Sequence, residues 1–146
     1  MRVVIQRVSG GKVSINGAVK SQIGQGFVIL LGVKEGDSEK EVQFLAEKIV
    51  NLRVMADESG KMNRSILEVN GEILAVSQFT LYADTSAGRR PSFIQAAKPE
   101  VSKPLYELFV SKLKRLGVKK VLTGEFGAYM QVEINNDGPV TIILEA

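Results

Sequence analysis

The order in which two hydrophobic periods follow each other along the chain restricts its fold more than any other feature. Short segments rich in Val and Ile, which occur 18 and 11 times among 146 residues, predict strands because β-branched side chains suit a pleated surface. Two longer segments instead repeat apolar residues every three or four positions, the spacing of one helix face. The order strands, helix, strands, helix, strands is not the regular alternation of a doubly wound parallel sheet. We therefore expect an α/β fold that forms a single domain over residues 1–146, with mixed, largely antiparallel β-sheet layers and two main helices packed on one side.

The two predicted helices differ in how clearly their starts are marked. The first runs from about 38 to 51, with Asp37 or Ser38 as its N-cap, since both side chains can accept hydrogen bonds from the first turn. The second carries two prolines, Pro99 and Pro104, which cannot both occupy the tolerant first helical position. It therefore begins either near 103, or at 99 with a kink.

The predicted strands are separated by turn signals and by one long loop. The dipeptide Asn16-Gly17 predicts a type I′ hairpin, and the apolar run 27–33 predicts a strand buried on both faces. Residues 83–98 lack any period and predict a long loop. Strands are expected at 2–9, 12–17, 18–23, 27–33, 52–56, 72–81, 119–123, 128–135 and 139–145.

Two absences restrict the chemistry. The chain has no cysteine and no histidine, which excludes disulfides, thiolate nucleophiles, zinc–thiolate sites, imidazole bases and the Ser-His-Asp triad. A hydrolase of this composition must use Ser, Thr, Tyr, Lys or carboxylates, backbone donors, or a group on its substrate.

The longest apolar run, 27–33, is far shorter than the ~20 residues that span a bilayer. Since no leader sequence is visible either, we expect a cytoplasmic protein.

The segment Ser77-Gln78-Phe79-Thr80-Leu81 places hydrogen-bonding side chains at the end of an apolar strand, just before the long loop. Alternation along a strand would put Ser77 and Phe79 on one face and Gln78 and Thr80 on the other. Functional sites are common where a strand meets a loop. A sheet edge that meets water explains the same pattern equally well.

The segment Asn136-Asp137-Gly138-Pro139-Val140-Thr141 lies between two predicted strands. Gly-Pro is a strong turn signal, and only about 5–6% of X–Pro bonds in folded proteins are cis. The pattern alone therefore favours an ordinary trans turn.

Basic residues gather in two places, and the net charge is +3. Arg89 and Arg90 follow a glycine in the long loop, where a solvated loop is the simpler explanation. The second cluster lies near the end of the second helix, where cations also complement the helix dipole; it comprises Lys112, Lys114, Arg115, Lys119 and Lys120. Together the clusters are compatible with an anionic polymer as partner.

Taken together, Ser77–Leu81 and Asn136–Thr141 resemble the two signatures of the D-aminoacyl-tRNA deacylase family. The resemblance extends over essentially the whole chain, and a departure occurs at Gly10-Gly11-Lys12, where the family more usually has an alanine before its second strand. That departure lies outside both signatures. The other matching segments are Gln6–Val8, Gly60–Asn63, Arg90–Phe93 and Phe126–Met130.

The resemblance implies a homodimeric enzyme that hydrolyses the ester between a D-amino acid and the terminal adenosine of tRNA, without metal or organic cofactor. In the family, the glycine-proline loop of one subunit enters the active site of the other with a cis peptide bond and excludes L-amino acids. The residues implied in substrate binding and chiral selection are Gly138, Pro139, Met130 and Arg7, and those implied in tRNA binding are Arg89 and Arg90. The implied partners are aminoacyl-tRNA and a second copy of the chain, with no membrane and no DNA.

The catalytic residues expected from this resemblance are Thr80, Ser77, Gln78 and Phe79. Because no histidine can activate the Thr80 hydroxyl, we assign Ser77, Gln78, Thr80 and the Phe79 backbone to positioning and oxyanion stabilisation. An acyl-enzyme on Thr80 is the alternative mechanism. A non-catalytic RNA-binding module is the alternative function, although such modules usually stack bases on exposed aromatic residues and this chain has only nine aromatic residues and no tryptophan.

Overall fold

The centre of the fold is a mixed six-stranded sheet, described here in a computed structural model of residues 1–146. Five strands lie in the order β2-β1-β3-β6-β7. The sixth strand, β8, lies outside this order and pairs with β1. β1 is antiparallel to β2, β3 and β8, whereas β3-β6 and β6-β7 are parallel. The strands are β1 (Arg2–Ile15), β2 (Ala18–Ile23), β3 (Gly26–Gly32), β6 (Glu72–Ser77), β7 (Val121–Thr123) and β8 (Gln131–Glu145), and a separate hairpin is formed by β4 (Met55–Ala56) and β5 (Met62–Arg64).

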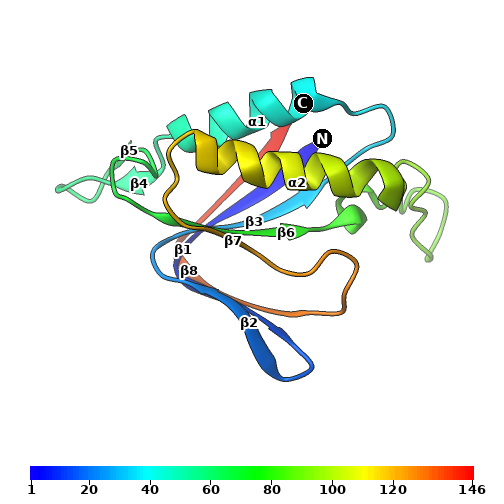
Figure 1. Ribbon diagram of the computed structural model, residues 1–146, viewed down its shortest axis with the longest axis horizontal. Helices are drawn as coiled ribbons and strands as arrows, with labels where there is room; N and C mark the ends of the chain where they lie inside the picture. Colours follow the sequence, from blue (N-terminus) through cyan, green and yellow to red (C-terminus); the bar gives the residue numbers. More distant parts are fainter.

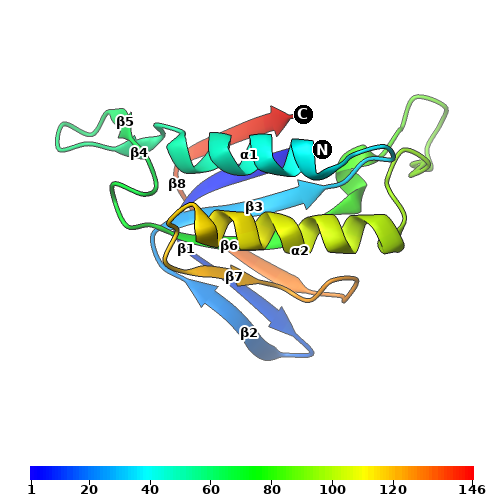
Figure 2. The same cartoon turned by 45° about the horizontal axis from the view of Figure 1, so that its top comes forward.

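Helices α1 (Glu39–Asn51) and α2 (Pro99–Arg115) lie side by side across one face of the sheet (Figure 1; Figure 2). Their apolar faces and the facing strand residues form a core of 24 buried side chains. A second core of six residues fills the opposite face, where the β1-β2 hairpin and the first half of β8 curl beneath the sheet (Figure 1). The predicted fold class, with both helices on one side, is confirmed. Neither helix is long and apolar enough to cross a membrane.

The helix ends follow the local sequence closely. Ser38 is the N-cap of α1 and forms a capping box with Glu41, as one of the two predicted caps. α2 begins at Pro99 and keeps Pro104 inside the helix, so the start near 103 is wrong. Pro99 needs no amide hydrogen at the first helical position.

Five of the predicted strands differ from the structure because pairing over long distances decides where a strand ends. The expected strands 2–9 and 12–17 are one strand, β1, with register shifts opposite β8. Likewise, 128–135 and 139–145 are parts of one strand, β8. The expected strand 52–56 is reduced to two residues of the small hairpin. The Asn16-Gly17 turn has positive φ angles of 51° and 80°, as a type I′ turn requires.

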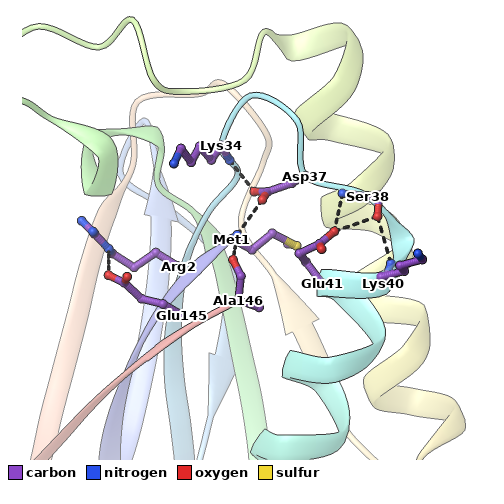
Figure 3. Close-up of polar contacts among 9 residues, drawn as sticks. All are labelled: Met1, Arg2, Lys34, Asp37, Ser38, Lys40, Glu41, Glu145 and Ala146. Carbon is purple, nitrogen blue, oxygen red and sulfur yellow. Dashed lines mark hydrogen bonds and ion pairs between the residues drawn. The ribbon is translucent and has the colours of Figure 1, made fainter.

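Polar contacts tie the start of β1 to the end of β8 and to the segment before α1 (Figure 3). The α-amino group of Met1 donates to Asp37 Oδ1 at 2.7 Å and to the carbonyl oxygen of Ala146 at 2.6 Å. The other carboxylate oxygen of Asp37 accepts from the backbone N–H of Lys34 at 2.6 Å. The start of β1 and the end of β8 are therefore fixed beside the β3–α1 connection.

Candidate active site

A cavity of about 530 Å³ opens at the carboxyl end of β6. β7 pairs with β6 only as far as Ala75 opposite Thr123, and the chain then turns away through the segment 124–130. The last residues of β6, Val76 and Ser77, are therefore left without a neighbouring strand on that side. The cavity occupies this space, and the start of α2 and the end of the long loop close it.

The cavity wall is mostly apolar and aromatic. Phe79 and Phe93 meet edge to face with ring centroids 5.0 Å apart, and Phe126 packs against Tyr106 at 6.0 Å. The lining residues are Val33, Val76, Ser77, Gln78, Phe79, Phe93, Ala96, Ala97, Pro99, Ser102, Phe126, Gly127, Ala128, Tyr129, Met130 and Val132. Such a wall suits a flat or apolar group, with Ser77, Gln78 and Ser102 as the polar contacts.

The signature segment at the cavity is a turn, not the end of a strand. β6 stops at Ser77, and Phe79–Tyr82 form one turn of 3₁₀ helix, so the expected strand 72–81 and its alternation are wrong beyond Ser77. The reason is that β3, the neighbour of β6, ends at Gly32, and the N–H of Gln78 makes the last contact, to the carbonyl of Leu31 at 2.8 Å. A strand without a partner has no ladder to continue.

This turn brings the predicted catalytic residues together. The side-chain amide of Gln78 donates to the hydroxyl oxygen of Thr80. Ser77, Gln78 and Phe79 line the cavity, whereas Thr80 is exposed beside it. The side-chain amide of Gln78 is not a base and cannot take the hydroxyl proton of Thr80. Gln78 therefore does not activate Thr80 as a nucleophile.

The cavity contains no charged side chain. None of its lining residues is Asp, Glu, Lys or Arg. Tyr106 lies behind the wall, where burial raises its pKa to about 12 and its hydroxyl donates to the carbonyl of Ala75 at 2.9 Å. No cluster of three or more His, Cys, Asp or Glu side chains is placed to hold a metal ion. The polar groups that the wall offers to a ligand are therefore uncharged.

The second signature segment forms a bulge in β8, away from the cavity. Asn136 pairs with Val8 and Thr141 pairs with Gln6, so four residues of β8 stand opposite the single residue Arg7. The segment is therefore a bulged loop within one strand, and the reverse turn expected from the pattern is wrong. The Gly138–Pro139 peptide bond is cis, as the resemblance implied.

Arg7 fixes this bulge. Its Nε donates to the carbonyl oxygen of Asp137 at 3.0 Å and lies 3.2 Å from the Asp137 carboxylate. Its Nη1 donates to the carbonyl oxygen of Val54 at 2.8 Å. The side chain of Arg7 is nearly buried, whereas Gly138 and Pro139 are exposed. The structure thus joins Arg7 to Gly138 and Pro139 but separates all three from Ser77, Gln78, Phe79 and Met130.

The predicted basic sites lie on different parts of the surface. Arg89 and Arg90 are exposed in the long loop, whose residue Phe93 lines the cavity. The second cluster lies at the far end of α2, where Lys120 forms an ion pair with Glu72 at 2.9 Å and Lys119 donates to Asn70. Only the first cluster is therefore near the cavity.

Several cavity residues were not predicted as site residues. Phe93, Phe126 and Tyr129 belong to segments that carry the family resemblance, so that signal could have identified them. Pro99 and Ser102 enter the wall only because α2 starts beside β6, and nothing in their local sequence marks them.

The fold and the cavity define the class of protein. A small α/β domain has an uncharged cavity with an aromatic wall beside the end of a buried strand, and Ser77, Gln78 and Ser102 are its polar residues. Such a site can hold an apolar or aromatic group.

Comparisons with known proteins give the family. The family model described as D-Tyr-tRNA(Tyr) deacylase matches residues 4–145. A D-aminoacyl-tRNA deacylase of Roseiflexus sp. (strain RS-1) is 58% identical over 146 residues, 100% of this chain and 94% of that relative. A D-aminoacyl-tRNA deacylase of Bacteroides thetaiotaomicron is 57% identical over 145 residues, 99% of this chain and 97% of that relative. The solved structure of a c-Myc DNA Unwinding Element Binding Protein matches with a TM-score of 0.95 and 43% identity, over 100% of this chain and 99% of its own. The chain belongs to the D-Tyr-tRNA(Tyr) deacylase family and is an enzyme, a hydrolase.

Proposed function

We propose that this enzyme hydrolyses the ester of D-aminoacyl-tRNA to free amino acid and tRNA, that it accepts glycyl-tRNA, and that it rejects L-aminoacyl-tRNA. The observation that carries the proposal is that the chain has both an uncharged cavity lined by Ser77, Gln78 and Phe79 and an exposed bulge at Gly138 and Pro139. This activity would remove wrongly charged tRNA before translation, and we place the enzyme in the cytoplasm because its substrate is used there.

The chemistry of the cavity suits an activated ester. Such an ester is far easier to cleave than an amide, and the neighbouring ribose hydroxyl of the terminal adenosine can orient a water molecule or assist proton transfer. We assign Ser77, Gln78, Thr80 and the Phe79 backbone to holding the ester and stabilising its oxyanion. The absence of charged groups from the wall supports this assignment over an acyl-enzyme on Thr80.

The bulge acts, in this proposal, on the cavity of a second subunit. Arg7, which holds the bulge, pairs with Phe27 of β3, whereas Ser77 pairs with Leu31 four residues further along that strand. The two sites are therefore separated by about 13 Å along the strand, and no residue of the bulge lines the cavity of its own chain. β8 is also an edge strand, paired only with β1, which leaves its outer side free for another copy.

The basic loop gives a test of tRNA binding. If Arg89 and Arg90 contact phosphates, the double change Arg89→Ala and Arg90→Ala should weaken tRNA binding about tenfold near 0.1 M salt and reduce the slope of log affinity against log salt by about two. Both side chains are exposed, so thermal unfolding should be nearly unchanged. Filter binding of deacylated tRNA over a salt series measures the effect, with duplex DNA of equal charge as the control, for which we expect no comparable binding. Salt-independent tRNA binding would exclude these arginines from the interface.

Turnover separates the enzyme from a non-catalytic RNA-binding module. D-tyrosyl-tRNA labelled in the amino acid is incubated with a tenth of a molar equivalent of protein, and free D-tyrosine is measured. We expect complete release over many turnovers. A binding module would instead protect the ester, so that release falls below the spontaneous rate in buffer.

A further inference from the structure

We propose that Arg2 is a positioning residue for the turn Gln78–Tyr82, holding the end of the turn that lies farthest from the cavity. The inference deepens the proposed function, because it concerns the turn that we assign to ester binding. Arg2 belongs to neither signature and does not line the cavity.

The register of the sheet places Arg2, Glu145 and Gly32 side by side next to the turn. On β1, Arg2 stands opposite Glu145 of β8 and opposite Gly32 of β3. Directly opposed residues on neighbouring strands project to the same face of a sheet. On one face of the sheet, the Glu145 carboxylate, the Arg2 guanidinium and Gly32, which has no side chain, therefore lie in a row across three strands.

The guanidinium group of Arg2 makes three contacts. Its Nε donates to the Glu145 carboxylate, and the pair is drawn in Figure 3. Its Nη1 donates to the carbonyl oxygen of Leu81 at 2.6 Å, and its central carbon lies 5.1 Å from the ring centroid of Tyr82. Tyr82 itself is buried, with 8% of its surface exposed. The Glu145 contact thus orients the planar guanidinium group, which binds the turn through the Leu81 carbonyl oxygen and the Tyr82 ring.

Gly32 supplies the space beneath the turn. A Cβ atom at this position would lie 3.1 Å from the carbonyl oxygen of Gln78, 3.1 Å from Leu81 Cβ and 3.2 Å from the Tyr82 ring. The turn therefore rests directly on the β3 backbone. Any side chain at this position would push it outward.

Beyond its first residue, the turn makes few hydrogen bonds to the sheet. Phe79 is 55% exposed and Thr80 is exposed. The N–H of Gln78 bonds to Leu31 at the near end, while the bonds from Leu81 to Gln78 and from Ala83 to Thr80 only close the turn on itself. Arg2 is the side chain that hydrogen-bonds its far end to the sheet. A shift of the donors by a fraction of an ångström affects catalysis more than binding when those donors act on the transition state.

The first experiment measures steady-state kinetics with D-tyrosyl-tRNA for Arg2→Met, which keeps an unbranched stem but removes the guanidinium group and its donors. We expect kcat to fall about tenfold while KM changes less than about twofold. Arg2→Lys keeps the positive charge and one donor group but not the planar fork, so its kcat should lie between those of Arg2→Met and the wild type. The matched control is Arg64→Met, whose exposed ion pair with Glu58 at 3.2 Å lies in the β4–β5 hairpin, and it should behave as the wild type.

A second readout does not depend on activity. Backbone amide exchange at Leu81 and Ala83 should be faster in Arg2→Met than in the wild type, with exchange in α1 unchanged. If Arg2→Met does not fold, Gly32→Ala tests the same support of the turn and should lower kcat while KM is retained. Unchanged exchange in the turn, unchanged kcat, or equal loss of kcat in the Met and Lys variants would overturn the inference. A wild type that exchanges as expected but releases no D-amino acid would overturn the proposed function alone.

Discussion

D-tyrosyl-tRNA is expected to be cleaved about a hundredfold faster than L-tyrosyl-tRNA, a difference in activation free energy of about 2.7 kcal/mol, and glycyl-tRNA is expected to be cleaved at a measurable rate. The reason lies in what a backbone loop can distinguish. Gly138 and Pro139 are exposed, and neither side chain carries a functional group. Placed against the bound α-carbon, the bulge would occupy the space into which every L side chain projects, whatever the chemistry of that side chain. A D side chain points away, and glycine has nothing to exclude.

The measurement compares the three esters at limiting enzyme, with D-alanyl-tRNA and L-alanyl-tRNA as a second pair. The alanyl pair controls for side-chain size, because steric exclusion should reject even a methyl group on the L side. Comparable cleavage of the two tyrosyl enantiomers would contradict exclusion by the bulge. Strict rejection of glycyl-tRNA would mean that the site recognises a side chain positively.

The parts of the fold that could be predicted are those set by neighbours in sequence. Ser38 and Glu41 mark the start of α1 through a capping box that involves four consecutive residues. Asn16-Gly17 marks its hairpin for the same local reason. The 3₁₀ turn after Ser77 could not be predicted, because it depends on where β3 ends. That end is a property of a strand some 45 positions earlier in the chain.

The candidate site divides in the same way. Ser77, Gln78 and Phe79 are adjacent in sequence, and they meet at the cavity as expected. Gly138 and Pro139 lie apart from the cavity within one chain, because β8 runs along β1 and carries them toward Arg7. The family resemblance assigned this loop to the active site of the other subunit, and that assignment stays a prediction. The local pattern around Gly138 and Pro139 alone carries no information on the distance to the cavity or on the subunit that the loop serves.

Gly138→Ala is expected to lower kcat/KM for D-tyrosyl-tRNA about a hundredfold. Gly138 has a φ of +129°, and an added Cβ would lie 2.9 Å from the Val140 backbone nitrogen and 3.2 Å from the Arg7 guanidinium. Both the backbone conformation and the space are unsuited to a side chain, which costs about 1–3 kcal/mol locally and displaces the bulge. Gly60→Ala is the matched control, because Gly60 also has a positive φ, of +78°, but nothing lies within 4 Å of its Cβ position.

Mixing two inactive variants tests whether the bulge acts on the other subunit. In the homodimer that we propose, Gln78→Ala damages the cavity and Gly138→Ala damages the bulge, so each of the two single-variant dimers should be nearly inactive. After co-refolding in equal amounts, half of the dimers carry one of each chain, and each of these contains one cavity and one bulge that are both intact. Activity should therefore return to about one quarter of the wild-type value. Mixing Gln78→Ala with Ser77→Ala is the control, because both changes damage the cavity and no combination restores one. If the bulge served the cavity of its own chain, every site in the first mixture would still carry a damaged part, and the mixture would stay inactive.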